Sequence, residues 1–215
     1  MIFEQIHANG DKNFAYLIGD PDTREAAIID PSYAPELTLA EAERHGLKVC
    51  YVISTHSHKD HVAGNAHVIE KTQAVEVLHE STPHPCRLRV KDNEELVVGS
   101  LRLRFLHTPG HIPDHLCIQT EGNLLTGDIL FVGKVGGTGS YFPGSDPKQQ
   151  WESLQRLKKL DPALVVWPGH DYGVKPSSTI GQEVDTNPFL LCKSFDEFQH
   201  LKAHWAEYKK AHNIA

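Results

Sequence analysis

The sequence lacks the features that mark membrane, secreted and nucleic-acid-binding proteins. No apolar run is long enough to span a membrane, and residues 1–7 have no basic start and no long apolar segment, so they predict a strand and not a signal peptide. Acidic residues outnumber basic ones by 28 to 21, and no stripe of basic residues with interleaved aromatics is present. We therefore expect neither a membrane nor a nucleic acid as a partner.

Cysteine is scarce and scattered. The four cysteines form no Cys-x-x-Cys pair, and Cys50 and Cys117 lie within apolar runs. This spacing favours buried free thiols in a reducing cytoplasm over disulfides or a cysteine metal site. The remaining composition, 40% hydrophobic and 23% charged over 215 residues, is typical of a globular domain, and we predict a single domain over residues 1–215.

Histidine, by contrast, is concentrated in one short segment. The sequence Thr-His-Ser-His-Lys-Asp-His directly follows the apolar run 49–53. His56 and His58 are two apart, so an extended chain points both side chains to the same side. Asp60 and His61 follow where the chain can turn into a helix. The end of this strand is therefore expected to bring imidazoles and a carboxylate to one point.

Three later apolar runs also lead to a ligand-type residue, each preceded by glycine, which lets a side chain approach a crowded site. With the first cluster they make seven candidate ligands: His56, His58, Asp60, His61, His111, Asp128 and His170. Zinc, iron and manganese all accept mixed imidazole and carboxylate ligands, so the set predicts a transition-metal centre with a position left for water. Any one of these histidines alone would be better explained as a surface or core residue.

Hydrophobic periodicity predicts two strand-rich halves, each with a helical layer. The expected strands are 2–7, 14–18, 26–29, 49–53, 75–79, 96–98, 101–106, 116–119, 123–126 and 163–167. The expected helices are 34–45, one from about Asp60 to Lys71, 146–160, and one amphipathic helix over 194–212. The first three strands are expected to form an antiparallel meander. This order predicts an α+β fold, a four-layer αββα sandwich with two sheets face to face.

Two segments allow more than one interpretation. His200 and His204 lie four apart in the tail helix and could bind a metal, but a solvated helix face is the better interpretation. Residues 131–145 carry five glycines without the signature of a phosphate-binding loop. Because they follow Asp128, we predict an irregular loop that borders the metal site, with a flexible connector as the alternative.

The motifs resemble those of the metallo-β-lactamase superfamily, over nearly the whole chain and in the same order. The resemblance implies the αββα sandwich and a dinuclear metal centre. It assigns His56, His58 and His111 to the first metal, assigns Asp60, His61 and His170 to the second, and makes Asp128 the bridge between them. The expected cofactors are therefore two divalent metal ions, zinc first, with iron or manganese as alternatives.

Within that superfamily, the segment from Gly169 to Gly173 and the later Thr186-Asn187-Pro188 are similar to the branch that contains glyoxalase II and the persulfide dioxygenases. Tyr172 occupies the place where glyoxalase II has a tyrosine beside its glutathione site. Both families carry Cys-Gly-Arg or Cys-Gly-Lys after the bridging aspartate, whereas this chain has Gly-Gly-Thr138. Lys134 is the candidate for the missing positive charge.

The first functional hypothesis is a metal-dependent hydrolase similar to glyoxalase II. A metal-bridging hydroxide would attack an ester, thioester or lactone, with a glutathione conjugate as the leading small-molecule substrate. Asp128 and Asp60 are the expected catalytic residues, with Asp60 orienting the hydroxide as well as binding metal. His115 either lines the pocket or has a capping or surface role.

Two other hypotheses stay open. His56, His111 and Asp128 together form a two-histidine, one-carboxylate triad, which suits the mononuclear non-haem Fe(II) centre of a persulfide dioxygenase. A non-catalytic metal-binding module is the third. The sequence sets neither the metal identity nor the oligomeric state.

Overall fold

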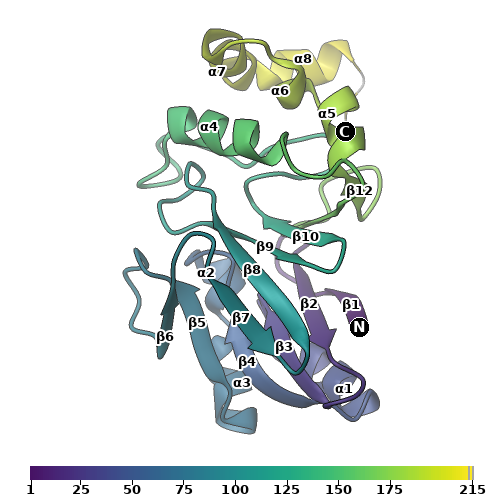
Figure 1. Cartoon of the computed structure of the whole chain (residues 1–215). Coiled ribbons are helices and arrows are strands. Elements are labelled where there is room, and N and C mark those ends of the chain that lie inside the picture. The colour runs from purple at the N-terminus through teal and green to yellow at the C-terminus, as the bar shows by residue number, and fades with distance from the viewer. Residues whose placement is uncertain (213, 215) are drawn as a thin grey trace.

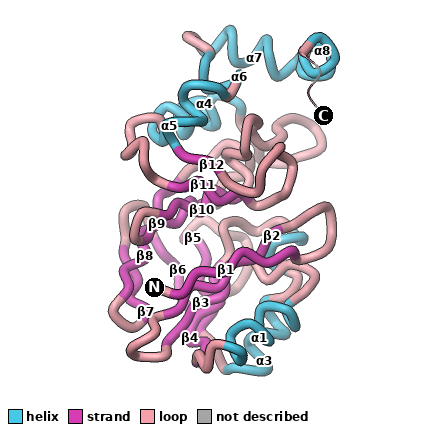
Figure 2. The backbone as a smooth tube through the Cα atoms, turned by 90° about the vertical axis from the view of Figure 1, so that its right-hand side faces the viewer, coloured by secondary structure: helices cyan, strands magenta, loops and turns pink. Residues whose placement is uncertain are grey.

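The computed structural model describes residues 1–212 and 214, which form two face-to-face sheets between two helical layers (Figure 1). Viewed from the side, most helices lie at the two ends of the molecule and the strands lie between them (Figure 2). The predicted four-layer αββα sandwich is therefore confirmed. Every helix in residues 1–212 is too short or too polar to traverse a lipid bilayer.

The first sheet has six strands in the order β1-β2-β3-β4-β5-β6. They are β1 Ile2–His7, β2 Phe14–Gly19, β3 Glu25–Ile29, β4 Lys48–Ile53, β5 Val75–His79 and β6 Leu88–Val90. The first three pair antiparallel, as the predicted meander requires. The others pair parallel, which places β4, the strand before the histidine cluster, inside the sheet.

The second sheet also has six strands, in the order β12-β11-β10-β9-β8-β7. They are β7 Glu95–Val98, β8 Leu101–His107, β9 Leu116–Thr120, β10 Asn123–Gly127, β11 Val165–Pro168 and β12 Ser178–Thr179. Because β10 and β11 are parallel, the residues after both strands emerge at the same edge of the sheet. The prediction missed β6 and β12, which are too short to show a period of two.

The helices fall into two groups. The first group is α1 Pro35–Arg44, the single turn α2 Lys59–Val62 and α3 Asn65–Thr72. The second is α4 Pro147–Leu157, α5 Ile180–Thr186, α6 Pro188–Leu191, α7 Phe195–Ala203 and α8 Trp205–Ala211. Helix α4 begins where Asp146 accepts hydrogen bonds from the N–H groups of Lys148 (2.7 Å) and Gln149 (3.1 Å). This cap and Pro147 at the first turn fix where α4 starts.

Three apolar clusters separate the four layers. Phe14, Ile53 and Phe105 belong to the cluster between the sheets, and each is at most 1% exposed. A second cluster lies between the first sheet and its helices, and a third joins α4 and α7 to the second sheet through residues such as Leu154 and Phe198. Each fully buried side chain of this size stabilises the fold by about 1.5 to 3 kcal/mol, so the core does not depend on the site described below.

Three predictions about the elements were wrong in detail. The tail is two helices and not one, because the backbone at His204 (φ −111°, ψ 21°) leaves the helical conformation. The helix expected from about Asp60 to Lys71 is α2 followed by α3, with a break at Gly64, whose backbone lies against the carbonyl of Ser32. All four cysteines are free thiols, and Cys117 is buried as expected, but Cys50 is only partly buried.

Candidate metal centre

The end of β4 and the turn α2 bring the first four candidates to one place. His56 and His61 are fully buried, and His58 and Asp60 are partly exposed toward a cavity. Nδ1 of His58 lies 2.9 Å from Nε2 of His56. The extended chain after Ile53 therefore points His56 and His58 to the same place, as their spacing predicted.

The other candidates arrive from the edge of the second sheet. Nε2 of His111, in the loop before β9, lies 3.0 Å from Nδ1 of His58. Nε2 of His170, which follows β11, lies 3.3 Å from Oδ2 of Asp60. Each of the two groups His56–His58–His111 and Asp60–His61–His170 has its ligand atoms within 4.8 Å of one another and could hold a metal ion.

Asp128, directly after β10, lies between the two groups. Its Oδ2 is 3.3 Å from Nε2 of His170 and 3.6 Å from Nε2 of His111. Its Oδ1 is 3.4 Å from Nε2 of His61. One carboxylate thus faces histidines from both groups, and the structure brings all seven candidates together.

The site contains buried polar atoms that no protein group satisfies. Nε2 of His61 and Oδ1 of Asp128 are both buried and have no hydrogen-bond partner among the described residues. Leaving such atoms unpaired costs about 1 to 3 kcal/mol each, and a divalent cation would satisfy them. Gly169 also packs against Oδ1 of Asp128 so closely that any side chain there would collide with it. The residues present therefore fit a divalent metal.

The two groups differ in charge. Burial and the neighbouring histidine His61 lower the pKa of His56 well below its ordinary value, and burial lowers that of His58. Burial also opposes charge on His170, but Asp128 outweighs it and raises the pKa of His170 to about 10. The first group is therefore ready to bind a cation at neutral pH, whereas a cation must displace a proton from His170.

A buried carboxylate and a backbone carbonyl fix the orientation of two of the rings. Nδ1 of His61 lies 2.9 Å from Oδ2 of Asp30, which also accepts a hydrogen bond from the Thr55 hydroxyl. Nδ1 of His170 donates to the carbonyl of Asp11 over 2.8 Å. Because these acceptors hold the Nδ1 proton, Nε2 of each ring faces the centre, where a cation binds it by displacing its proton.

Comparison with known proteins agrees with this geometry. A protein-family model described as "Metallo-beta-lactamase superfamily" matches residues 8–170, which include all seven candidate ligands. The chain belongs to the metallo-beta-lactamase superfamily.

Relatives within this superfamily carry two kinds of name. A "Hydroxyacylglutathione hydrolase" from Anaeromyxobacter dehalogenans (strain 2CP-C) is 35% identical over 80% of this chain and 66% of the relative. The chain thus spans about two thirds of that relative's length. The crystal structure of ETHE1 from Myxococcus xanthus is 33% identical and superposes with a TM-score of 0.90, over 95% of this chain and 91% of that one. The structure titled TTHA1623 in a di-iron-bound form is 30% identical, with a TM-score of 0.75 over 87% of this chain and all of that one.

The sequence left the role of His115 open, and the structure places it against the candidate metal centre. Nε2 of His115 accepts a hydrogen bond from the backbone N–H of Asp128 over 3.0 Å. Its Nδ1 therefore carries the proton, and the Thr108 hydroxyl is 2.9 Å away to accept it. His115 is fully buried and positions Asp128; it neither lines the pocket nor lies on the surface.

Sequence reasoning missed Asn13 altogether. Its Nδ2 donates to Oδ2 of Asp60 (3.0 Å) and to the backbone carbonyl of Asp60 (3.2 Å). Asn13 lies in the turn before β2, 47 residues from Asp60, so only the packing of the folded chain joins them. Nothing in the spacing of the sequence signals this contact.

Aromatic side chains form the walls of a cavity of about 220 Å³ at the site. The ring of Tyr172 stacks on that of His170 at 4.7 Å, and its hydroxyl donates to Oδ2 of Asp11 over 2.6 Å. Phe142, from the glycine-rich loop, lies 5.0 Å from the ring of His111. The loop therefore borders the site, as predicted, and Tyr172 lies at the cavity wall.

Lys134 lies next to this cavity and not in it. It lines a separate pocket of about 350 Å³ that shares Tyr172 with the metal-site cavity. Partial burial, followed by the charges of Lys209 and Lys12, lowers the pKa of Lys134.

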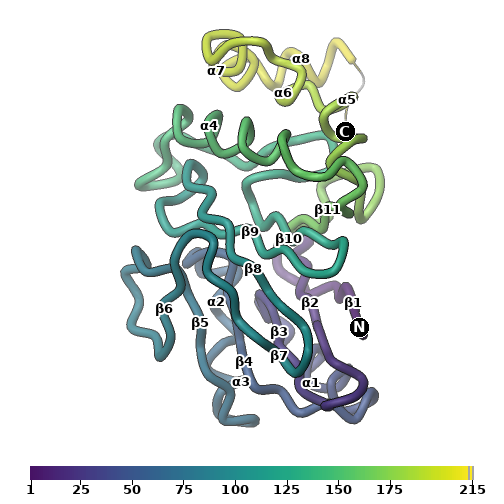
Figure 3. Tube along the Cα trace, viewed as in Figure 1, coloured from purple at the N-terminus to yellow at the C-terminus, as the bar shows by residue number. Residues whose placement is uncertain are grey.

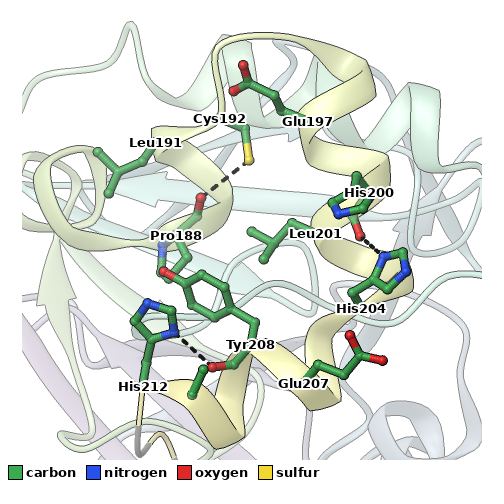
Figure 4. Close-up of a pocket in the computed structure, with 11 residues that line it drawn as sticks. Pro188, Leu191, Cys192, Glu197, His200, Leu201, His204, Glu207, Tyr208 and His212 are labelled. Carbon is green, nitrogen blue, oxygen red and sulfur yellow. Dashed lines mark hydrogen bonds between the residues drawn. The ribbon is translucent and has the colours of Figure 1, made fainter.

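His200, in α7, and His204, directly after α7, are exposed and line a pocket that shares no residue with the metal-site cavity (Figure 4). Their rings are 4.2 Å apart, and Nδ1 of His204 donates to the carbonyl of His200. They line a surface groove of about 550 Å³ with Leu201 and Tyr208. Within the described part of the chain, no group of three possible metal ligands includes them, and both side chains are exposed.

Proposed function

We propose that this chain is a metal-dependent hydrolase of a small ester, thioester or lactone. In this proposal His56, His58 and His111 would hold one divalent ion, and Asp60, His61 and His170 would hold a second. Asp128 would bind both. The observation that carries the proposal is the position of Asp128, whose two oxygens face histidines of both groups.

Divalent ions in such sites supply a hydroxide nucleophile at neutral pH and polarise the carbonyl under attack. The protein supplies orientation. Burial opposes charge on Asp60, but hydrogen bonds and charge from His170, His61 and Asn13 outweigh it and keep the pKa of Asp60 below its ordinary value. Asp60 therefore remains a carboxylate that can accept a hydrogen bond from the attacking water and hold it toward the substrate.

The proposed substrate is small, because the cavity is about 220 Å³ and its walls include Phe131, Phe142 and Tyr172. A glutathione thioester is the leading candidate, supported by the names of the curated relatives. Its acyl end would enter this cavity past Tyr172. Lys134, in the neighbouring pocket, would then be placed to bind a carboxylate of the glutathione part.

We propose zinc as the metal, with iron and manganese as alternatives that suit the same ligands. The di-iron form of TTHA1623 supports a two-metal centre and keeps iron open. We also propose a cytoplasmic location, which the four free cysteines support.

A persulfide dioxygenase is the second candidate. The similarity to ETHE1 from Myxococcus xanthus covers 95% of this chain and 91% of that one, more of the relative's length than the first hydrolase alignment covers, so the hydrolase name does not stand alone. In that case His56, His111 and Asp128 would hold a single Fe(II).

One experiment separates the two candidates. The protein is purified without added metal, its zinc, iron and manganese are measured, and it is tested for S-lactoylglutathione hydrolysis and for oxygen uptake with glutathione persulfide. Hydrolysis by a protein with two metal equivalents is the expected result. One iron equivalent with oxygen uptake and no hydrolysis would replace the hydrolase by the dioxygenase.

A further inference from the structure

The C-terminal helices hold the glycine-rich loop that borders the metal centre. Oε2 of Glu183, in α5, accepts the backbone N–H of Gly133 over 2.9 Å. Nζ of Lys202, in α7, donates to the carbonyl of Gly136 over 2.8 Å. Helix α7 lies beside α4 (Figure 3), so these contacts reach the loop from the layer farthest from the first sheet.

Lys202 makes its hydrogen bonds within a small polar cluster. The carbonyl of Gly136 also accepts from Nε2 of Gln150, over 3.0 Å, and Oε1 of Gln150 accepts from Nζ of Lys202. Gln150 is fully buried on α4. Lys202 has no carboxylate partner within the described part of the chain, so its partly buried amino group is directed at these two oxygens. Keeping a lysine there costs desolvation, which a purely apolar helix contact would avoid.

The loop residues Gly136 and Gly137, beside the carbonyl that Lys202 holds, contact two of the proposed metal ligands. The carbonyl of Gly137 accepts the Nδ1 proton of His111 over 2.8 Å, which turns Nε2 of that ring to the centre. The Gly136 backbone lies so close to the carbonyl of Asp128 that no side chain would fit. A shift of this peptide would therefore displace both His111 and Asp128.

We propose that Lys202 is a positioning residue for the metal centre. It fixes the carbonyl of Gly136, and through the next residue it sets the orientation of His111. The proposal rests on the metal-site assignment made under the proposed function, but it does not depend on which reaction the centre performs. It also gives the C-terminal helices a role, because they carry the group that holds the loop in place.

Lys158 provides a matched control. Its Nζ donates to the carbonyl of Leu190 over 2.7 Å, so it also joins α4 to the C-terminal helices through a lysine-to-carbonyl hydrogen bond. Leu190 is not in the glycine-rich loop. Replacing Lys158 should therefore weaken the helical layer in a similar way and leave the metal ligands where they are.

The test compares Lys202→Met, Lys202→Arg and Lys158→Met with the wild type. Zinc affinity is measured by chelator competition, the visible absorption spectrum is recorded after loading with Co²⁺, and thermal unfolding reports stability. We expect Lys202→Met to bind zinc about tenfold more weakly, the lower end of the effect of groups that orient metal ligands, with an altered cobalt spectrum. Lys202→Arg should restore both, and Lys158→Met should change neither.

Gln150→Glu covers the case in which Lys202→Met does not fold. It keeps an acceptor for Lys202 but sets a carboxylate oxygen against the carbonyl of Gly136, so it should also weaken zinc binding. The proposal would be overturned if a folded Lys202→Met variant kept the zinc affinity and the cobalt spectrum of the wild type. If Lys202→Met does not fold, the same result in Gln150→Glu would overturn it. A wild type that binds metal but hydrolyses no ester would overturn only the proposed function, and one that binds no metal would overturn both.

Discussion

The backbone N–H of Asp128 donates a hydrogen bond to Nε2 of His115 over 3.0 Å, and this contact holds the residue that faces both metal-ligand groups. His115 is not a proposed metal ligand, but it therefore controls the position of Asp128, the residue proposed to bind both metal ions. The consequence can be measured.

Replacing His115 by Phe keeps a ring in the buried space but removes the acceptor. The N–H of Asp128 is then buried without a partner, which should lower the free energy of unfolding by about 1 to 3 kcal/mol and reduce metal content. Urea unfolding and metal analysis measure the two effects. The control is His200→Phe, on the exposed face of α7, which should stay within about 0.5 kcal/mol of wild type. A His115→Phe protein that matches the wild type in both assays would refute the role of His115.

Although the names of the relatives make a glutathione thioester the leading candidate, the protein should use it less well than an uncharged thioester, because Thr138 stands where the similar families carry a basic residue. The loss of one charge-assisted hydrogen bond costs about 1.5 to 3 kcal/mol, or roughly ten- to hundredfold in affinity. The measurement is kcat/KM for S-lactoylglutathione beside an uncharged thioester. A micromolar KM for the glutathione substrate would contradict the prediction. The exception is a Lys134→Ala variant that loses this low KM and still uses the uncharged substrate as well as the wild type does, because that result would identify Lys134 as the replacement for the missing basic residue.

The stability of the protein should depend on pH through Lys202. Burial lowers the pKa of Lys202 from 10.5 to about 7. Between these values the unfolded chain binds the proton and the folded chain does not, so the contribution of Lys202 to stability rises with pH across that window and is least favourable below about pH 7. Urea unfolding of wild type and Lys202→Met should give a stability difference that shifts in favour of wild type from pH 7 toward pH 10. A difference that does not change with pH would show that the amino group titrates normally.

The sequence was sufficient to predict the four layers, most of the strands and the meeting of the seven candidate ligands. These follow from local patterns: the period of each strand, and ligand-type residues placed directly after strands whose ends meet at one edge. The break at His204 was not predicted, because the apolar spacing of Phe198, Leu201 and Trp205 continues through it. The single-domain organisation stays a prediction.

The contacts that orient the ligands could not be predicted, since they join segments far apart in the sequence. Asn13 reaches Asp60 across 47 residues, and Lys202 reaches Gly136 across 66. Such pairs depend on how the turns and helices pack, which periodicity does not encode. A single sequence therefore predicts which side chains can bind a metal, but not which groups orient those side chains.

The most direct test of the whole account is the metal content of Asp128→Asn, measured together with its circular dichroism on one sample. Asparagine keeps the size of the side chain but removes the charge that offsets two cations about 3.5 to 4 Å apart. We expect the variant to lose at least one metal equivalent and most of its activity while its spectrum stays that of a folded protein. Full retention of both metals would contradict the bridging role of Asp128.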